Sequence, residues 1–169
     1  MKICGITSAA DAVVAAESGA DAIGLNFVSR SRRCLDVEAA RVIRVVVPDR
    51  VVTVGIFWDH SAGEIIEIAK ALGLGAAQVH GDTPGVAAAV ATVVQTVIQV
   101  VRIDGPAVGP FDGDADTILM LDGPVPGNGV PIDWDVASDL ITGRRILLAG
   151  GLRPGNVAEA VRRVRPWGG

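Results

Sequence analysis

Short apolar runs alternate with helix signals along the whole chain, and this alternation constrains the fold more than any other feature. The runs are rich in branched aliphatic residues, as expected for buried parallel strands. They occupy residues 1–4, 22–27, 51–57, 76–80, 96–103, 117–122 and 146–149. Because parallel strands need a crossover connection, strands that alternate with helices imply parallel pairing.

Helix signals lie between the apolar runs. Ser8 with Asp11 and Ser61 with Glu64 have the spacing of capping boxes, Asp36 stands at an N-cap position, and Pro154 stands at a first-turn position. The predicted helices occupy residues 8–18, 36–47, 61–72, 83–93, 134–140 and 154–164.

Two architectures fit this pattern, an open doubly wound sheet and a (β/α)8 barrel. Polar residues and glycines at strand carboxyl ends favour the barrel, because barrels keep their active sites on that face. They are Cys4, Asn26, His80, Arg102, Asp122, Gly150 and Gly151. No GxGxxG sequence follows the first strand, which argues against a dinucleotide fold. We therefore predict an α/β protein with a (β/α)8 TIM-barrel fold, formed by a single domain over residues 1–169.

Two features predict an incomplete barrel. The chain has 169 residues, whereas such barrels usually need about 200 or more. Residues 104–116 are too short and too rich in Gly, Pro and Asp for an ordinary fifth helix, and residues 165–169 lie where an eighth strand should begin. We expect a barrel that lacks the eighth strand and helix and has a degenerate fifth helix.

Composition limits the partners. The net charge of −4 gives no reason to expect nucleic acid. Polar residues interrupt the most apolar stretch, 85–103, so it does not predict a membrane span. The two cysteines make no disulfide framework, and no signal peptide precedes Lys2. We expect a cytoplasmic monomer or homodimer.

Cys4 is the first candidate for a catalytic residue. It ends the first predicted strand, with Lys2 on the same strand and Gly5 after it. Positive charge near a thiol favours the reactive thiolate. The alternative is a packing role, because free cysteines are among the most buried residues.

An ordered set of motifs makes the chain resemble the phosphoribosylanthranilate isomerase family of tryptophan biosynthesis. Each motif is weak alone, and the order makes the set specific. The matches are Lys2–Thr7, Ser18–Gly24, 31–33, 54–57, 78–81, Leu121-Asp122, Gly127 and Gly129 with Asp133-Trp134, and 149–157.

The resemblance implies an isomerisation of the Amadori type, in which an aminosugar phosphate changes from aldose to ketose. It implies Cys4 as the general base that removes the C2′ proton and Asp122 as the general acid that protonates the ring oxygen, with no cofactor and no metal. Desolvation between apolar strand ends is expected to raise the pKa of Asp122 and keep it protonated. From the residues alone, Asp122 can equally be a loop cap for Gly123.

The resemblance also implies substrate-binding residues. Arg33 corresponds to the residue that binds the anthranilate carboxylate, while a solvated basic loop suits Arg30 and Arg32 better. Gln78 and His80 belong to the wall of the site. Backbone amides of Gly127, Gly129, Gly150 and Gly151 are expected to bind the phosphate of a small phosphorylated substrate.

The chain departs from the family pattern twice. Val130-Pro131 stands where the family often has Lys-Thr, and the family's Asp-Val-Ser-Ser-Gly-Val-Glu segment does not follow Trp167. Two other functions therefore remain open. One is a histidine-pathway aminosugar isomerase, although those enzymes have aspartate where this chain has Cys4. The other is an inactive truncated barrel that only binds phosphorylated ligands.

Overall fold

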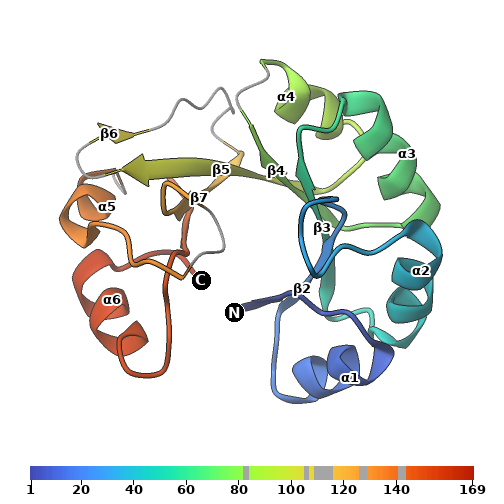
Figure 1. Cartoon of the computed structure of the whole chain (residues 1–169), viewed down its shortest axis with the longest axis horizontal. Helices are drawn as coiled ribbons and strands as arrows, with labels where there is room; N and C mark the ends of the chain where they lie inside the picture. Colours follow the sequence, from blue (N-terminus) through green and yellow to red (C-terminus); the bar gives the residue numbers. More distant parts are fainter. Residues whose placement is uncertain (82–83, 105–106, 109–115, 126–128, 141–143) are drawn as a thin grey trace. The chain divides into compact units, whose positions relative to one another are not determined.

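The computed structural model describes residues 1–81, 84–104, 107–108, 116–125, 129–140 and 144–169. The chain divides into two compact units, Met1–Val97 (unit 1) and Ile98–Gly169 (unit 2). In each unit, parallel strands alternate with helices (Figure 1). The alternation predicted from the sequence is confirmed, and the single domain over 1–169 stays a prediction.

Unit 1 carries four parallel strands in chain order: β1 (Lys2–Cys4), β2 (Ala22–Asn26), β3 (Val52–Trp58) and β4 (Ala76–His80). Its helices are α1 (Ala9–Glu17), α2 (Val37–Val46), α3 (Ala62–Leu72) and α4 (Val86–Val90). The register sets Cys4 beside Gly24 and Ile56 beside Gln78. Side chains at the carboxyl ends of these strands therefore share one edge of the sheet.

The predicted caps start three of these helices. The Ser8 hydroxyl accepts from the Asp11 amide at 3.1 Å, and Asp36 accepts from the Ala39 amide at 2.7 Å. Ser61 and Glu64 form a complete capping box, in which each side chain accepts from the other residue's amide. These bonds satisfy amides that a helix leaves without an intrahelical partner.

The two faces of the unit 1 sheet have different roles. Alternate residues of β2 to β4 pack with the helices in one apolar core, which includes Ile23, Leu25, Phe57 and Val79. Figure 1 shows α1, α2 and α3 along this side of the strands. Because successive strand residues point to opposite faces, Lys2, Cys4, Gln78 and His80 occupy the face away from these helices.

Unit 2 has the same plan. Most of β5 (Thr96–Asp104) belongs to it, and β5 pairs in parallel with β7 (Ile118–Asp122), which pairs in parallel with β8 (Ile146–Leu148). Helices α5 (Trp134–Leu140) and α6 (Val157–Val164) contribute to a second apolar core with alternate strand residues such as Leu121 and Leu148. Gly168 makes a parallel bridge with Leu147, where the sequence predicts another strand to begin.

A short strand, β6 (Ala107–Val108), pairs antiparallel with β5 in the segment that is too short for an ordinary fifth helix. Two predicted helices were wrong in their bounds. Helix α4 is shorter than predicted, because Gly85 adopts a left-handed φ of 81° just before it and the Thr92 hydroxyl donates to the Ala89 carbonyl after it.

The last helix also begins later than predicted. Pro154 lies in a turn, and α6 starts at Val157. The side-chain Oδ1 atom of Asn156 accepts from the Arg153 amide at 2.8 Å and closes this turn, so the Asn156 side chain makes no cap bond to the helix. Within the described residues, no helix is long and apolar enough to cross a membrane.

Candidate active site

Cys4 lies at the carboxyl end of β1, and its side chain is exposed. The Lys2 ammonium donates to the Cys4 sulfur over 2.5 Å and to the Gln78 carbonyl oxygen over 2.8 Å. A Cβ atom at Gly24, on the neighbouring strand, would lie 3.0 Å from this sulfur. The absence of a side chain at Gly24 thus leaves room for the thiol, which does not have the packing role considered as the alternative.

Arg33 lies against the residue that follows Cys4. A Cβ atom at Gly5 would lie 2.5 Å from Arg33 Cδ and 2.9 Å from Nη1, and Gly5 has a left-handed φ of +78°. Only glycine meets both requirements without strain. The structure therefore brings together Cys4 and Arg33, two residues predicted to act on the same substrate.

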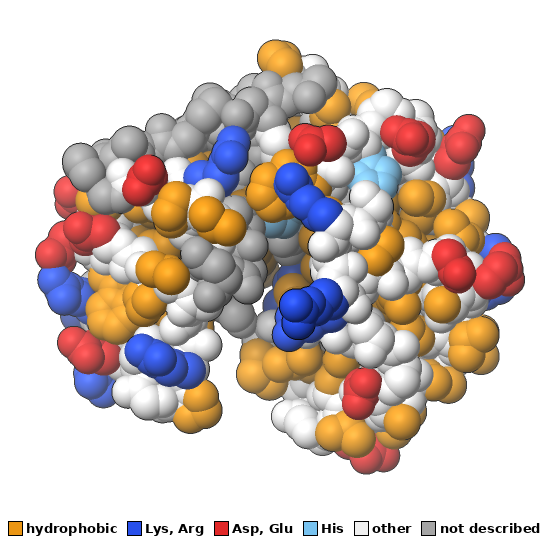
Figure 2. All heavy atoms as spheres, viewed as in Figure 1, with side chains coloured by type: hydrophobic (Ala, Val, Ile, Leu, Met, Phe, Trp, Pro, Cys, Tyr) orange, Lys and Arg blue, Asp and Glu red, His pale blue; other side chains and the backbone are white. Residues whose placement is uncertain are grey.

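A network of side-chain bonds holds the loop that carries Arg33. Asn26, at the end of β2, accepts from the Val28 amide at 2.8 Å and donates to the Ser31 hydroxyl at 3.2 Å. The same hydroxyl accepts from the Arg33 amide at 3.1 Å. In Figure 2 a group of Lys and Arg side chains, in blue, lies over the part of unit 1 where this loop runs.

Gln78 and His80 lie at the end of β4, and Gln78 is buried. The Gln78 amide nitrogen and the His80 Nε2 atom are 2.9 Å apart. The His80 ring stacks on Trp58 with centroids 5.1 Å apart and an interplanar angle of 9°. Arg30 is exposed, as expected for a solvated loop, and its guanidinium also lies 3.6 Å from the Trp58 ring centroid.

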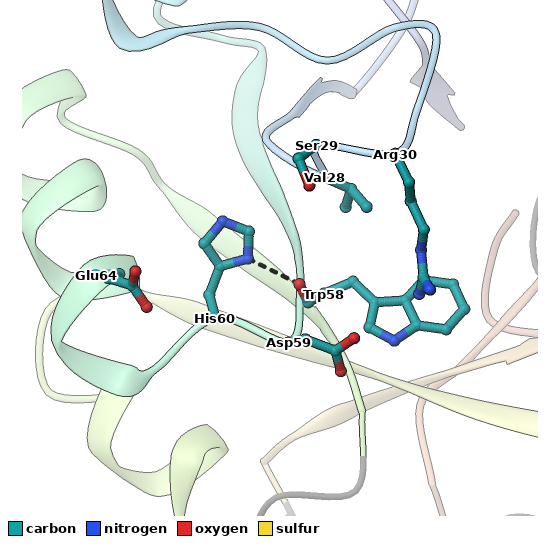
Figure 3. A pocket seen from close by; sticks show the side chains of 7 residues that line it. All are labelled: Val28, Ser29, Arg30, Trp58, Asp59, His60 and Glu64. Atoms are coloured by element: carbon teal, nitrogen blue, oxygen red, sulfur yellow. Dashed lines mark hydrogen bonds between the residues drawn. The ribbon is translucent and has the colours of Figure 1, made fainter.

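A hollow of about 340 Å³ lies beside this stack in unit 1 (Figure 3). Its walls come from the loop after β2, from the end of β3 with the loop that follows it, and from the first turn of α3: Val28, Ser29, Arg30, Trp58, Asp59, His60 and Glu64. The His60 Nδ1 atom lies 3.0 Å from the Trp58 carbonyl oxygen. The Ser61 hydroxyl, and then the Ser61 amide, lower the pKa of Glu64. The predicted site residues lie outside this hollow.

Asp122 lies at the end of β7 in unit 2 and is 9 % exposed. Its Oδ1 atom accepts from the Gly123 amide at 2.8 Å, as a loop cap would. The register places Arg102 beside Asp122. The burial agrees with a desolvated acid, so the geometry is compatible with both of the roles considered for this carboxyl group.

Glycines predicted to bind phosphate lie close together in unit 2. Gly129, Gly150 and Gly151 have φ values of +77°, +79° and +64°. A Cβ atom at Gly151 would lie 2.6 Å from the Gly129 carbonyl oxygen, and one at Gly150 would lie 3.2 Å from Asp122 Oδ1. Gly127 lies outside the described residues. Three of the four predicted glycines therefore belong to two loop segments in contact, beside the predicted acid.

Sequence reasoning missed the residues that hold this site in shape. Gly5 and Gly24 fit around Arg33 and Cys4, and Ser31 holds the loop of Arg33. The sequence shows a glycine after the first strand and a serine two residues before Arg33, but it does not show which side chains contact them in the folded protein. In the described part of the chain, no group of three or more His, Cys, Asp or Glu side chains is arranged to hold a metal ion.

Parallel strands that alternate with helices, with the candidate site residues at the strand carboxyl ends, are typical of the class of (β/α)-barrel enzymes. A family model described as N-(5'phosphoribosyl)anthranilate (PRA) isomerase matches residues 1–168. The chain belongs to this family, and the barrel fold predicted from the sequence is confirmed.

Similar proteins agree with this assignment. The N-(5'-phosphoribosyl)anthranilate isomerase of Myxococcus xanthus is 41 % identical over 177 residues, which cover 99 % of this chain and 82 % of that protein. The crystal structure of the phosphoribosyl anthranilate isomerase of Thermus thermophilus has a TM-score of 0.89 and 37 % identity, and covers 99 % of this chain and 84 % of its own.

A third similar protein was solved with a ligand. This phosphoribosyl anthranilate isomerase is in complex with reduced 1-(o-carboxyphenylamino)-1-deoxyribulose 5-phosphate. It is 31 % identical, with a TM-score of 0.83 and coverage of 99 % of this chain and 83 % of its own.

Proposed function

We propose that this chain converts N-(5'-phosphoribosyl)anthranilate into the corresponding 1-deoxyribulose phosphate, with Cys4 as general base and Asp122 as general acid. The observation that carries the proposal is the surroundings of Cys4 in a chain of this family. Lys2 contacts the sulfur, and Arg33 lies against Gly5, the next residue along. The Cys4 sulfur can then accept a proton from an anthranilate substrate whose carboxylate is bound by the Arg33 guanidinium.

The two groups act at successive steps. Asp122 gives its proton to the furanose ring oxygen, and the C1′–oxygen bond breaks to leave an open-chain iminium. The Cys4 thiolate then takes the proton from C2′, and the electron pair moves toward nitrogen to give an enolamine. A proton added at C1′ and one lost from the C2′ hydroxyl give the ketose. Atoms and electrons balance within the substrate, so the reaction needs no external oxidant.

Arg33 and the unit 2 glycines supply binding. The guanidinium of Arg33 can donate two parallel bonds to the anthranilate carboxylate. The phosphate is assigned to the loops of Gly129, Gly150 and Gly151, and Gly127 belongs to the same proposal. Support comes from the positive φ values of the three described glycines and from the phosphorylated ligand of the related isomerase. The monomer or homodimer state stays a prediction.

Turnover followed by the loss of anthranilate fluorescence tests the proposal. We expect the parent chain to turn over, and Cys4→Ser and Asp122→Asn each to lose at least about 100-fold in kcat, as expected when a general base or acid is removed. Cys34→Ser, at the chain's other exposed cysteine, is the matched control and should keep parent activity. Full turnover by Cys4→Ser would refute the mechanism. Ligand binding without turnover by the parent would identify the chain as a binding protein.

A further inference from the structure

Lys2 makes contacts that the proposed reaction does not use. Its ammonium lies between the Cys4 sulfur, at 2.5 Å, and the Gln78 carbonyl oxygen, at 2.8 Å. Lys2 and Cys4 are alternate residues of β1 and share one face, whereas Gln78 lies on β4. Since β2 and β3 lie between these strands in unit 1, the lysine side chain spans the face of the sheet to reach Gln78.

The chemistry of the donors fixes how Gln78 is oriented. An ammonium group can only donate, so the Gln78 oxygen must face Lys2 and its amide nitrogen must face away. That nitrogen lies 2.9 Å from His80 Nε2. Because the amide nitrogen can only donate, His80 Nε2 is the acceptor of this contact.

The His80 ring is itself held. It stacks on Trp58 at 5.1 Å between centroids, and the Arg30 guanidinium lies 3.6 Å from the Trp58 centroid. A contiguous series of contacts therefore leads from the loop after β2 to the thiol. The amide oxygen and the amide nitrogen of the buried Gln78 side chain both contact other side chains of the protein. This arrangement fits a residue that holds Lys2 better than one that binds the substrate.

We propose that Lys2 is a positioning residue for the general base: its ammonium holds the Cys4 sulfur as a thiolate, and Gln78, oriented by His80, holds the ammonium. The inference rests on the proposed function in one respect, that Cys4 is the base. A thiolate is the form that can accept a proton, and an adjacent lysine favours it over the thiol. In this proposal Lys2 acts through Cys4, so its loss should lower kcat and leave KM close to the parent value.

The thiol itself provides a readout that does not depend on turnover. In a Cys34→Ser background Cys4 is the only cysteine, so the rate of its alkylation by iodoacetamide at neutral pH reports the thiolate population. We expect Lys2→Met to slow alkylation at least about tenfold, as expected for removal of a neighbouring opposite charge. Lys70→Met, at the chain's only other lysine, is the matched control and should alkylate at the parent rate.

Two further variants separate positioning from folding. Lys2→Arg keeps a cation at this position and should recover part of the alkylation rate, which a purely structural role of Lys2 would not predict. Gln78→Met removes the acceptor and should slow alkylation by a smaller factor than Lys2→Met. Denaturant unfolding of each variant shows whether a native fold remains.

The outcomes distinguish this inference from the proposed function. A Lys2→Met protein that is folded and alkylates as fast as the parent overturns the role of Lys2, whatever its turnover. Slower alkylation in Lys2→Met, in a chain whose parent shows no turnover, supports the effect of Lys2 on the Cys4 thiolate and overturns the proposed function instead. A fall in kcat that matches the fall in alkylation rate, with KM kept, supports both.

Discussion

Gly5→Ala is the perturbation that tests most directly how Arg33 is placed. The new Cβ atom would lie 2.5 Å from Arg33 Cδ and 2.9 Å from Nη1, closer than real contacts allow. Arg33 is an exposed, flexible side chain, so it can move away, but it must then leave the position beside Cys4. The variant therefore displaces the guanidinium without removing its charge.

Two separate costs follow from the geometry. A left-handed backbone costs an L-residue about 1–2 kcal/mol, and Gly5 has a φ of +78°. A hydrogen bond to a charged group contributes about 1.5–3 kcal/mol, so displacing Arg33 should raise KM about tenfold or more. This binding is lost equally from ground and transition states, and kcat should stay near the parent value.

Gly73→Ala is the matched control. Gly73 also has a left-handed φ, +60°, but nothing lies within 4 Å of its added Cβ atom. Denaturant unfolding should show a loss of about 1–2 kcal/mol in both variants, while steady-state kinetics should show a higher KM in Gly5→Ala alone. In an Arg33→Met background, Gly5→Ala should have no further effect on KM. A KM that stays at the parent value in Gly5→Ala, or rises equally without Arg33, would refute the reasoning.

Two further predictions concern stability. Gly151→Ala should lower the free energy of unfolding by about 2–5 kcal/mol, because its Cβ atom would meet the backbone of residues 129–131 at 2.5–2.7 Å. Gly129→Ala, which has open space, should lose only about 1–2 kcal/mol in the same urea titration, and equal losses would contradict the prediction. The capping box of α3 should stabilise the protein more at neutral than at acidic pH. Bonds from the Ser61 hydroxyl and amide lower the pKa of Glu64 below its usual range, so the contribution is complete above the unfolded-state pKa and is lost as the pH falls through the lower folded-state pKa. The difference between the unfolding midpoints of the parent and of Ser61→Ala should narrow at acidic pH to the part that the bond from the Glu64 amide to the Ser61 hydroxyl contributes, and a constant difference would show that the Glu64 carboxylate does not contribute.

The sequence predicted most of the fold because local signals and the fold agree. Caps at Ser8, Asp36 and Ser61 start the helices where they were expected, and the apolar runs became strands within a residue or two at each end. The predicted helix bounds were wrong where tertiary contacts determine the local structure. Asn156 could cap a helix by itself, but its side chain is engaged with Arg153 and Gly151, so α6 begins after the turn.

The site was predicted less completely, for a physical reason. Residue type and strand position indicated Cys4, Arg33 and Asp122, but the contacts that hold side chains depend on which residues lie opposite one another across strands. The bond from Lys2 to Gln78 joins residues 76 positions apart. No local pattern in the sequence specifies such a pair.

Successive side chains of each strand point to opposite faces, and this explains why the fold can hold polar site residues on one face while the other face packs in the apolar core. Val79 packs with the helices of unit 1, and Gln78, its neighbour, lies on the other face beside Lys2. In unit 2, Leu121 belongs to the helix-packed core and Asp122, the next residue, ends the strand on the opposite face. An apolar run thus identifies a strand, while the polar residue that interrupts the run marks the face on which a reaction can be placed. Substitutions on one face should therefore act mainly on stability, and substitutions on the other mainly on turnover.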